Sequence, residues 1–194
     1  MARARAYTRE ELLDAAERLL IEHGYEGLRM KHLSDTLRGA RSTIYEYFAN
    51  KEELVAACMR RLMENLLRAF GGLEELETLT AIKRMLVIFL ERSAMHKLLS
   101  QTPKLDQAAS ESAKQDLLFL EQGHDMLKQE IHALFERAQV EGIMRRDIPL
   151  PAITAVFFHA IDTPNWLQLP TEQWAELLFS LWWRGADNHN EAKL

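Results

Sequence analysis

Apolar residues recur at steps of three and four along almost the whole of this chain, which is the spacing of one face of an α-helix. No segment of useful length alternates apolar and polar residues, and only eight glycines and five prolines occur among 194 residues. This composition argues against a β-protein built on many tight turns. The pattern therefore predicts an all-α fold of about nine helices, with enough apolar material for a sizeable core.

Capping signals predict where the N-terminal helices begin. Thr8 followed by Glu11, and Asn50 followed by Glu53, each form a capping box, in which two side chains satisfy free backbone N–H groups at a helix start. The first box opens a helix that we expect to end at Gly24, because glycine tolerates the left-handed conformation of a helix C-terminus. The second opens a helix that we expect to end at the glycine pair 71–72.

Two very short helical segments lie between these boxes, on either side of Gly39. Met30, Leu33 and Leu37 share one face of the first segment, and the second runs from about 40 to 47. Two short helices joined by a tight turn and supported by a third are the plan of a helix-turn-helix. Further helices are predicted at about 80–99, 111–141, 150–161 and 170–185.

Composition limits where such a chain acts. Cys58 is the only cysteine, so no internal disulfide can form, and its place between Leu54 and Leu62 on an apolar face predicts a packing role. The longest stretch without Asp, Glu, Lys or Arg is 14 residues, at 148–161, which is shorter than the ~20 residues of a membrane span. No apolar run follows the first arginines, so no secretory signal is predicted. We expect a cytoplasmic protein that does not enter a membrane.

Charge is unevenly distributed along the chain. Residues 1–70 have a net charge of +1 and residues 71–194 a net charge of −6, and residues 29–51 hold five basic side chains against two acidic ones. A basic patch on an acidic protein favours a polyanion partner that binds one face only. The alternative is an ordinary solvated surface.

The stretch from Thr8 to Leu54 carries a specific combination of motifs. It holds Ala15-Ala16, then Gly24-Tyr25, then Leu33, and then the run TIYEYFANKEEL at 43–54. In these features it resembles the DNA-binding domain of the TetR family, the tetracycline-repressor-like bacterial regulators. The resemblance covers about a quarter of the chain and implies a helix-turn-helix domain at 1–50. It also implies a helical domain for effector binding and dimerisation at 51–194.

The chain departs from this family pattern at three places. The family usually has Ala-Gly-Val-Ser across the turn, whereas residues 37–40 are Leu-Arg-Gly-Ala, so the glycine comes one position later. Ser34 replaces a small alanine. The hydroxyl residue that usually caps the second helix is replaced around Arg29, which removes a cap worth ~1 kcal/mol.

The resemblance and the chemistry of the side chains together suggest how DNA is bound. An α-helix fits the major groove, where arginine pairs with guanine and threonine contacts the thymine methyl group. The predicted base-contacting residues are Arg41, Ser42, Thr43 and Tyr45. The predicted phosphate-contacting residues are Arg29, Tyr47 and Lys51. The alternative for Tyr45 and Tyr47 is that they only pack within the protein. His32, and a basic N-terminal arm with Arg3 and Arg5, either contact DNA or are solvated.

The last two predicted helices are apolar on more than one side, so each must be buried on more than one side. Two such helices and their two-fold copies would form the four-helix interface of an obligate dimer. The predicted interface residues are Val156, Phe157, Ile161, Trp174, Leu177, Leu178, Leu181 and Trp182. The alternative is a second layer of the same subunit's core.

A small-molecule pocket is expected in the C-terminal region, because adaptable methionines and aromatic residues accompany a few polar groups there. The candidate lining residues are Met85, Phe89, Arg92, Met95, His96, His124, Met126 and Phe157. The alternative is that these residues belong to the core. The spacing of His, Cys and acidic residues predicts no metal site, and no cofactor is expected.

These observations favour a ligand-responsive repressor that binds a palindromic operator as a homodimer. Release by a small apolar or amphipathic effector is implied by the resemblance. The alternatives are an activator, or a TetR-like regulator that acts through a protein partner without an inducer. We do not expect an enzyme, because the sequence has no GxGxxG, GxSxG, HExxH or CxxC pattern.

Overall fold

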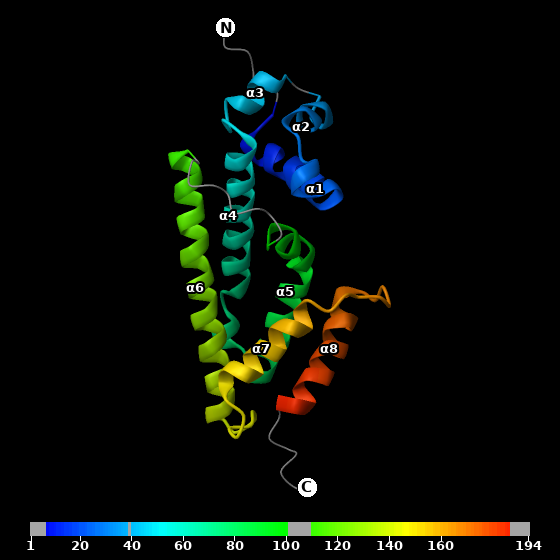
Figure 1. Ribbon diagram of the computed structural model, residues 1–194. Helices are drawn as coiled ribbons and strands as arrows, with labels where there is room; N and C mark the ends of the chain where they lie inside the picture. Colours follow the sequence, from blue (N-terminus) through cyan, green and yellow to red (C-terminus); the bar gives the residue numbers. More distant parts are fainter. Residues whose placement is uncertain (1–6, 39, 101–109, 187–194) are drawn as a thin grey trace. The chain divides into compact units, whose positions relative to one another are not determined.

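The computed structural model describes residues 7–38, 40–100 and 110–186, and all the regular elements in this part of the chain are helices (Figure 1). The all-α prediction is therefore confirmed. The elements are α1 Arg9–Gly27, α2 Met30–Thr36, α3 Arg41–Tyr45, α4 Lys51–Phe70, the 3-10 turn η1 Leu73–Glu75, α5 Thr78–Ser100, α6 Glu111–Val140, α7 Leu150–Ile161 and α8 Thr171–Ala186. Gly39 and the proposed arm residues Arg3 and Arg5 lie outside the described residues.

The predicted capping box at Thr8 forms, whereas at Asn50 only the N-cap half of the predicted box forms. The Thr8 hydroxyl accepts from the Glu11 N–H at 3.2 Å, and the Glu11 carboxylate accepts from the Thr8 N–H at 2.7 Å. At α4, Asn50 accepts from the Glu53 N–H at 2.8 Å, but the Glu53 carboxylate accepts from the N–H of Ala49, at 2.6 Å. The Glu53 carboxylate therefore holds the end of the segment that follows α3 and does not complete a capping box.

Glycines end the helices where the backbone must become left-handed. Gly24 leaves the helical conformation with a φ of 69°, as predicted, although one further turn carries α1 to Gly27. Gly72 and Gly142 follow α4 and α6 with φ of 87° and 75°. A residue without a Cβ adopts these angles without steric cost, so these glycines end the helices.

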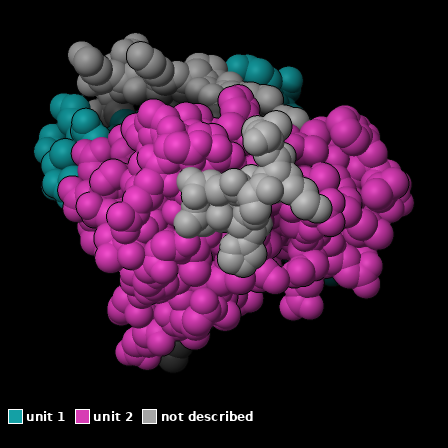
Figure 2. All heavy atoms as spheres, turned by 90° about the horizontal axis from the view of Figure 1, so that it is seen from below, with its two compact units in different colours: residues 1–65, 94–123 teal, residues 66–93, 124–194 magenta. Residues whose placement is uncertain are grey.

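The described chain divides into two compact units, whose boundaries fall inside α4, α5 and α6 (Figure 2). Unit 1 comprises residues 1–65 and 94–123, and unit 2 comprises residues 66–93 and 124–194. The short helices α2 and α3 belong to unit 1, whereas α7 and α8 belong to unit 2. No helix in the described residues is long and apolar enough to cross a membrane.

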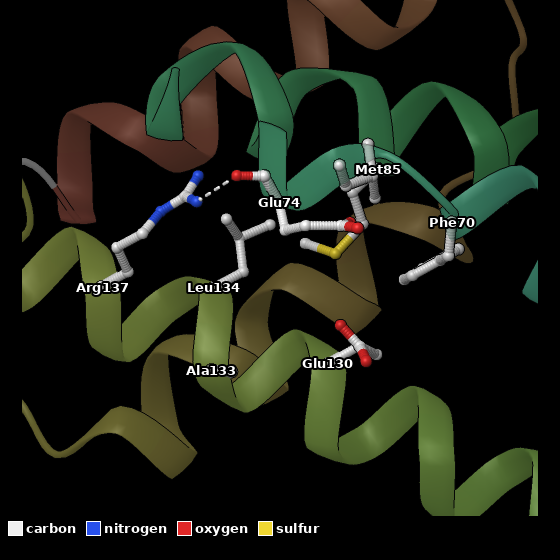
Figure 3. Close-up of a pocket in the computed structure, with 8 residues that line it drawn as sticks. Phe70, Glu74, Met85, Glu130, Ala133, Leu134 and Arg137 are labelled. Carbon is white, nitrogen blue, oxygen red and sulfur yellow. Dashed lines mark hydrogen bonds between the residues drawn. The ribbon is translucent and has the colours of Figure 1, made fainter. Parts of the chain in front are cut away.

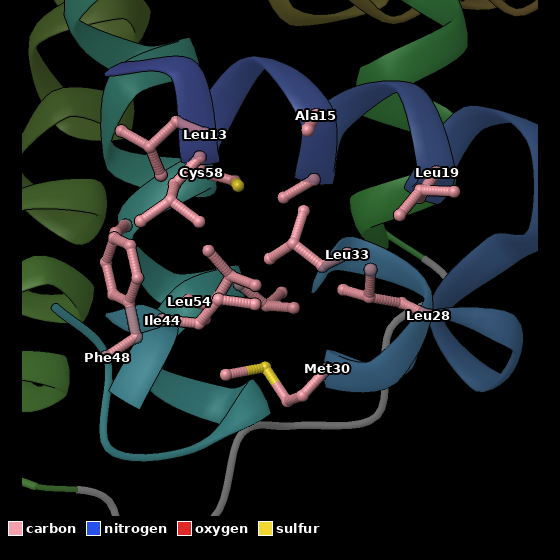
Figure 4. Close-up of a cluster of buried hydrophobic side chains, with 14 of the residues drawn as sticks. Leu13, Ala15, Leu19, Leu28, Met30, Leu33, Ile44, Phe48, Leu54 and Cys58 are labelled. Atoms are coloured by element: carbon pink, nitrogen blue, oxygen red, sulfur yellow. The ribbon is translucent and has the colours of Figure 1, made fainter. Parts of the chain in front are cut away.

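Unit 1 has a continuous apolar core, in which the side chains of Leu33, Ile44 and Leu54 converge (Figure 4). Cys58 is buried in the same cluster, so its predicted packing role is confirmed. Burial raises the pKa of the Cys58 thiol, because a thiolate would lose its hydration there. The thiol therefore stays protonated and unreactive at neutral pH.

An arginine between two helices of unit 1 was not anticipated from the sequence. Arg61 on α4 contacts three carboxylates of α1, those of Glu10, Asp14 and Glu17, at 3.1, 2.8 and 2.8 Å. Burial alone would lower the pKa of Arg61, but the hydrogen bonds to these carboxylates raise it overall. Since one rigid guanidinium contacts three acids that follow one another at helical spacing along α1, it sets the orientation of α1 on α4.

A close helix approach also escaped the sequence analysis. A Cβ atom added at Gly123 of α6 would lie 2.4 Å from Cγ of Met63 on α4, which is closer than any real contact. Only glycine lets these two helices of unit 1 approach this closely.

Unit 2 is organised around aromatic rings. The ring centroid of Phe157 on α7 lies 5.3 Å from that of Phe135 and 5.0 Å from that of Trp182. The indole N–H of Trp182 donates a hydrogen bond to the carbonyl of Ile153 at 3.3 Å. Offset and edge-to-face pairs of this kind add to the gain from area burial alone. These contacts hold α6, α7 and α8 together within the unit.

Candidate nucleic-acid interface

The helices α2 and α3 are only seven and five residues long, too short to be stable alone. Each buries one side in the core of unit 1, since Leu33 of α2 and Ile44 of α3 are fully buried. Their opposite sides are exposed. The core therefore fixes a pair of short helices joined by a turn and presents their polar faces to solvent.

A tyrosine ahead of the first cap fixes the start of α3. The buried Tyr7 donates its hydroxyl proton to the carbonyl of Ala40 at 2.8 Å, and Ala40 is the N-cap residue of α3. Tyr47 in turn donates to the carbonyl of Tyr7 at 3.1 Å. Burial raises the pKa of the Tyr7 phenol, partly offset by a hydrogen bond with Thr43, so Tyr7 remains a donor at neutral pH.

The sequence analysis missed Tyr7, although one local signal was available. An apolar residue directly before a helix cap often packs onto that helix. The fold gives Tyr7 a second role that this signal does not show, because its partner Ala40 is 33 residues away.

The four predicted base-contacting residues lie together on α3. Arg41 and Ser42 are exposed, Thr43 is half-buried, and Tyr45 has 44% of its surface exposed. Ile44, between them, points into the core. A five-residue helix thus offers one guanidinium, two hydroxyl groups and one phenol on its outer side, all groups that can bond to base edges.

The predicted phosphate contacts have mixed surroundings. Arg29 is exposed at the start of α2 and makes no side-chain cap there, in line with the loss of a capping hydroxyl. Lys51 is half-buried, with its ammonium nitrogen 3.8 Å from the ring centroid of Tyr25. The Tyr47 hydroxyl already has an internal acceptor. Of the three, Arg29 is therefore the most open to a phosphate.

The basic side chains in and beside the two short helices are exposed, whereas several arginines elsewhere in the described chain are held by carboxylates. Arg60, Arg61 and Arg145 are each paired with carboxylates. The exposed cations that form no ion pair with another described residue include Arg29, Lys31, Arg38 and Arg41. A cluster of cations without internal partners is suited to phosphate, since no existing ion pair must be broken first.

The turn between α2 and α3 contains a strained residue. Arg38 has a φ of 52°, in the left-handed region that disfavours residues with a Cβ. This is the position at which the family pattern has glycine. The turn therefore keeps the left-handed conformation although its glycine comes one residue later.

We expect Arg38→Gly to raise the free energy of unfolding by ~1 kcal/mol, because a left-handed non-glycine residue costs about 1–2 kcal/mol, partly offset by the greater chain entropy of glycine. Urea unfolding measures the change. Arg38→Ala is the matched control, since it removes the same charge and keeps the Cβ. Equal stability of the two variants would contradict the prediction.

The residues predicted to line an effector pocket are dispersed. Met85 and Phe157 are fully buried in unit 2, and the half-buried Phe89 packs its ring 5.3 Å from that of Phe70 and 5.8 Å from that of Phe158. The half-buried Arg92 donates to the carbonyl of Ile88 in its own helix. His124 and Met126 are exposed on α6, and the side chains of Met95 and His96 lie outside the described part.

The residues predicted for the dimer interface separate into two groups. Those buried within unit 2 are Phe157, Ile161, Trp174, Leu178 and Trp182. Those exposed are Val156, Leu177 and Leu181, at 58%, 40% and 63%. Within the described residues, no group of three His, Cys, Asp or Glu side chains is placed to hold a metal ion.

A compact helical unit with two short helices, a strained tight turn and an outward polar face defines a protein of the helix-turn-helix class. Residues 12–58 match the family model described as bacterial regulatory proteins, tetR family. The N-terminal domain of this chain therefore belongs to the tetR family, and the described chain has the all-helical fold of that family.

Curated relatives match this same segment. The HTH-type transcriptional repressor AcnR of Corynebacterium diphtheriae is 40% identical over 52 residues, which is 27% of each chain. AcnR of Corynebacterium glutamicum is 38% identical over 53 residues, covering 27% of this chain and 28% of its own. The alignments thus span about a quarter of the length of these relatives.

Solved structures match over nearly the whole chain at low identity, and so show the fold. The ketosteroid transcriptional regulator KstR2 of Mycobacterium tuberculosis superposes with a TM-score of 0.72 at 15% identity, covering 96% of this chain and 100% of its own. FadR of Bacillus subtilis in complex with stearoyl-CoA superposes with a TM-score of 0.67 at 18% sequence identity. The match covers 92% of this chain and 99% of the FadR chain. AibR in complex with isovaleryl coenzyme A and operator DNA superposes with a TM-score of 0.69 at 16% sequence identity. The match covers 88% of this chain and 96% of the AibR chain.

Proposed function

We propose that this protein is a ligand-responsive transcriptional repressor that binds a palindromic operator as a homodimer. In this proposal residues 1–50 contact DNA, and residues 51–194 bind the effector and form the dimer. The observation that carries it is the outer face of α2 and α3. Arg29, Lys31, Arg38 and Arg41 there are exposed cations without a described ion-pair partner, in a domain whose sequence matches the tetR family.

The proposed DNA contacts comprise four exposed residues, Arg29, Arg41, Ser42 and Tyr45, and three half-buried ones, Thr43, Tyr47 and Lys51. Arg41, Ser42, Thr43 and Tyr45 would enter the major groove, while Arg29, Lys51 and Tyr47 would face the phosphates. Base contacts give sequence preference and phosphate contacts give salt-dependent affinity. Both are needed for a repressor that finds one site among many.

The proposed dimer rests on apolar side chains that a single subunit leaves exposed. Val156, Leu177 and Leu181 were predicted for this interface and are exposed in unit 2. Phe158, Trp166 and Leu167 are also exposed, at 38%, 77% and 66%, and the sequence analysis did not single them out for this role. Exposed apolar side chains on α7, on α8 and in the segment between them favour association, and two-fold symmetry would match a palindromic site.

The proposed effector step uses the difference between two states of the dimer. A ligand bound in the C-terminal domain would favour a spacing of the two helix-turn-helix domains that does not match the operator half-sites. It can shift this equilibrium only by its difference in affinity for the two states. The stearoyl-CoA and isovaleryl coenzyme A named for FadR and AibR support ligand binding by proteins of this fold.

Binding to the DNA upstream of the protein's own gene tests the proposal. Fluorescence anisotropy should show a preference of ~10³ or more over scrambled DNA. The specific affinity should also fall steeply between about 50 and 200 mM salt. Equal affinity for both DNAs at every salt concentration would overturn the repressor proposal and favour action through a protein partner.

A further inference from the structure

Unit 2 contains a cavity of about 140 Å³ between the end of α4, η1, α5 and α6 (Figure 3). Its apolar wall is formed by Phe70, Leu73, Met85 and Leu134. Met85 is the only one of these that the sequence analysis placed in an effector pocket. The cavity lies within one unit, so its shape does not depend on how the two units are arranged.

The size of the cavity limits the ligand. An engineered cavity of about 150 Å³ lined by aliphatic and aromatic side chains binds benzene. A cavity of about 140 Å³ with a similar wall therefore accepts one six-membered ring or an alkyl group of comparable size. The lining residues Glu74, Glu130 and Ala133 are exposed, so the cavity opens to solvent on their side and a polar group of the ligand can extend out of it.

The charged residues that line the cavity set the charge of the ligand. The carboxylate of Glu74 accepts from the N–H of Gly72 at 3.1 Å, whereas Glu130 has no hydrogen bond or ion pair with another described residue. Figure 3 shows the Glu130 side chain on the α6 side of the cavity, below Met85 in this view. Both glutamates are exposed, so their carboxylates stand at the open side of the cavity, where a negative charge attracts a cation and repels an anion.

The one cation of the lining does not neutralise these acids. Arg137 donates from its two terminal nitrogens to the carbonyls of Glu74 and Leu76, at 3.0 and 3.1 Å, and its Nε lies 3.9 Å from the carboxylate of Glu141. Its terminal nitrogens are therefore directed to the backbone of η1 and of Leu76, whereas its buried Nε has no hydrogen-bond partner among the described residues. The side chain closes one end of the cavity and keeps η1 on α6.

We propose that this cavity binds a small amphipathic cation, in which one ring or short alkyl group fills the apolar wall and an ammonium group pairs with Glu130. The inference deepens the proposed function, because it assigns a chemical class to the effector, and its effector role rests on that function. A cationic effector would distinguish this chain from FadR and AibR, because their acyl coenzyme A ligands are anions.

Calorimetric titration of the full chain at pH 7 with benzylamine, benzyl alcohol and benzoate tests the site. These three molecules share one ring and differ in charge. We expect benzylamine to bind about tenfold more tightly than benzyl alcohol, the effect of one charge-assisted hydrogen bond. Benzoate should bind most weakly. Equal affinities for benzylamine and benzoate would overturn the proposal.

Variants locate the binding. Glu130→Gln should reduce the affinity for benzylamine to within about twofold of that for benzyl alcohol. Glu136→Gln, an exposed acid on the same helix outside the lining, should leave all three affinities unchanged. Ala133→Leu, at an exposed lining position where folding is not threatened, should weaken both benzylamine and benzyl alcohol. Unchanged benzylamine binding in Glu130→Gln would reject the site.

Operator binding of the same samples separates the two proposals. If the operator preference persists but benzylamine does not bind, the cavity inference fails and the repressor proposal stands. If benzylamine binds through Glu130 but no DNA preference exists, the site stands and the repressor proposal fails.

Discussion

Replacing Arg41 with alanine should reduce the affinity of the dimer for its operator by ~10² or more, because a bidentate contact with guanine contributes about 1–3 kcal/mol and the dimer makes it twice. Arg41 is exposed in the first turn of α3 and pairs with no described carboxylate. Anisotropy titrations with operator and scrambled DNA measure the change. The loss should be large on the operator and small on scrambled DNA.

Arg84→Ala is the matched control for this experiment. Arg84 is exposed on α5 in unit 2, so its replacement removes the same charge outside the helix-turn-helix. It should leave the sequence preference intact. If Arg41→Ala weakens operator and scrambled DNA equally, Arg41 contacts phosphate, and the proposed base contact is wrong.

Replacing Leu181 with aspartate should dissociate the dimer, because both copies of this position would bury a carboxylate without a partner. Leu181 is 63% exposed in a single subunit, so the charge remains solvated in the monomer and the monomer fold should be kept. Sedimentation equilibrium should show a rise of ~10³ or more in the dimer dissociation constant, as expected for the loss of several kcal/mol. Operator affinity should fall with it.

The control for the dimer is Leu118→Asp. Leu118 is an exposed leucine of α6 in unit 1, with 55% of its surface exposed, so the change in exposed side chain is nearly the same. This variant should remain dimeric. A dimer that survives Leu181→Asp, or one that Leu118→Asp disrupts, would place the interface elsewhere.

Local rules predicted the helices well because each depends on neighbours within one turn. The Thr8–Glu11 box and the left-handed Gly24 and Gly142 are short-range effects of side-chain oxygens and of a missing Cβ. The Asn50 cap was also correct, although the Glu53 carboxylate bonds to Ala49 instead of Asn50. Only the end of α1 was placed a turn too early.

Contacts between distant segments were out of reach of these rules. Arg61 was one of many charged helix positions until the fold placed it against three acids of α1. Tyr7 was an ordinary aromatic residue until it met the carbonyl of Ala40. The approach of Gly123 to Met63 depends on two helices 60 residues apart in sequence.

The apolar helices α7 and α8 show the same division. Periodicity marked eight residues for burial, yet five of them fill the core of their own unit and only Val156, Leu177 and Leu181 remain exposed. A hydrophobic pattern records that a side chain avoids water, and carries no information on whether its neighbours come from the same subunit or from another.

The sequence by itself therefore determined the helical class, most helix boundaries and the pair of short helices, because spacing and caps are properties of adjacent residues. The DNA contacts that it suggested remain a proposal. Only the tertiary structure decided that Arg38 is left-handed in the turn, which apolar residues stay exposed, and that Glu130 stands at a cavity with Phe70 and Met85. These features arise where segments far apart in the chain pack together, and no local pattern encodes that geometry.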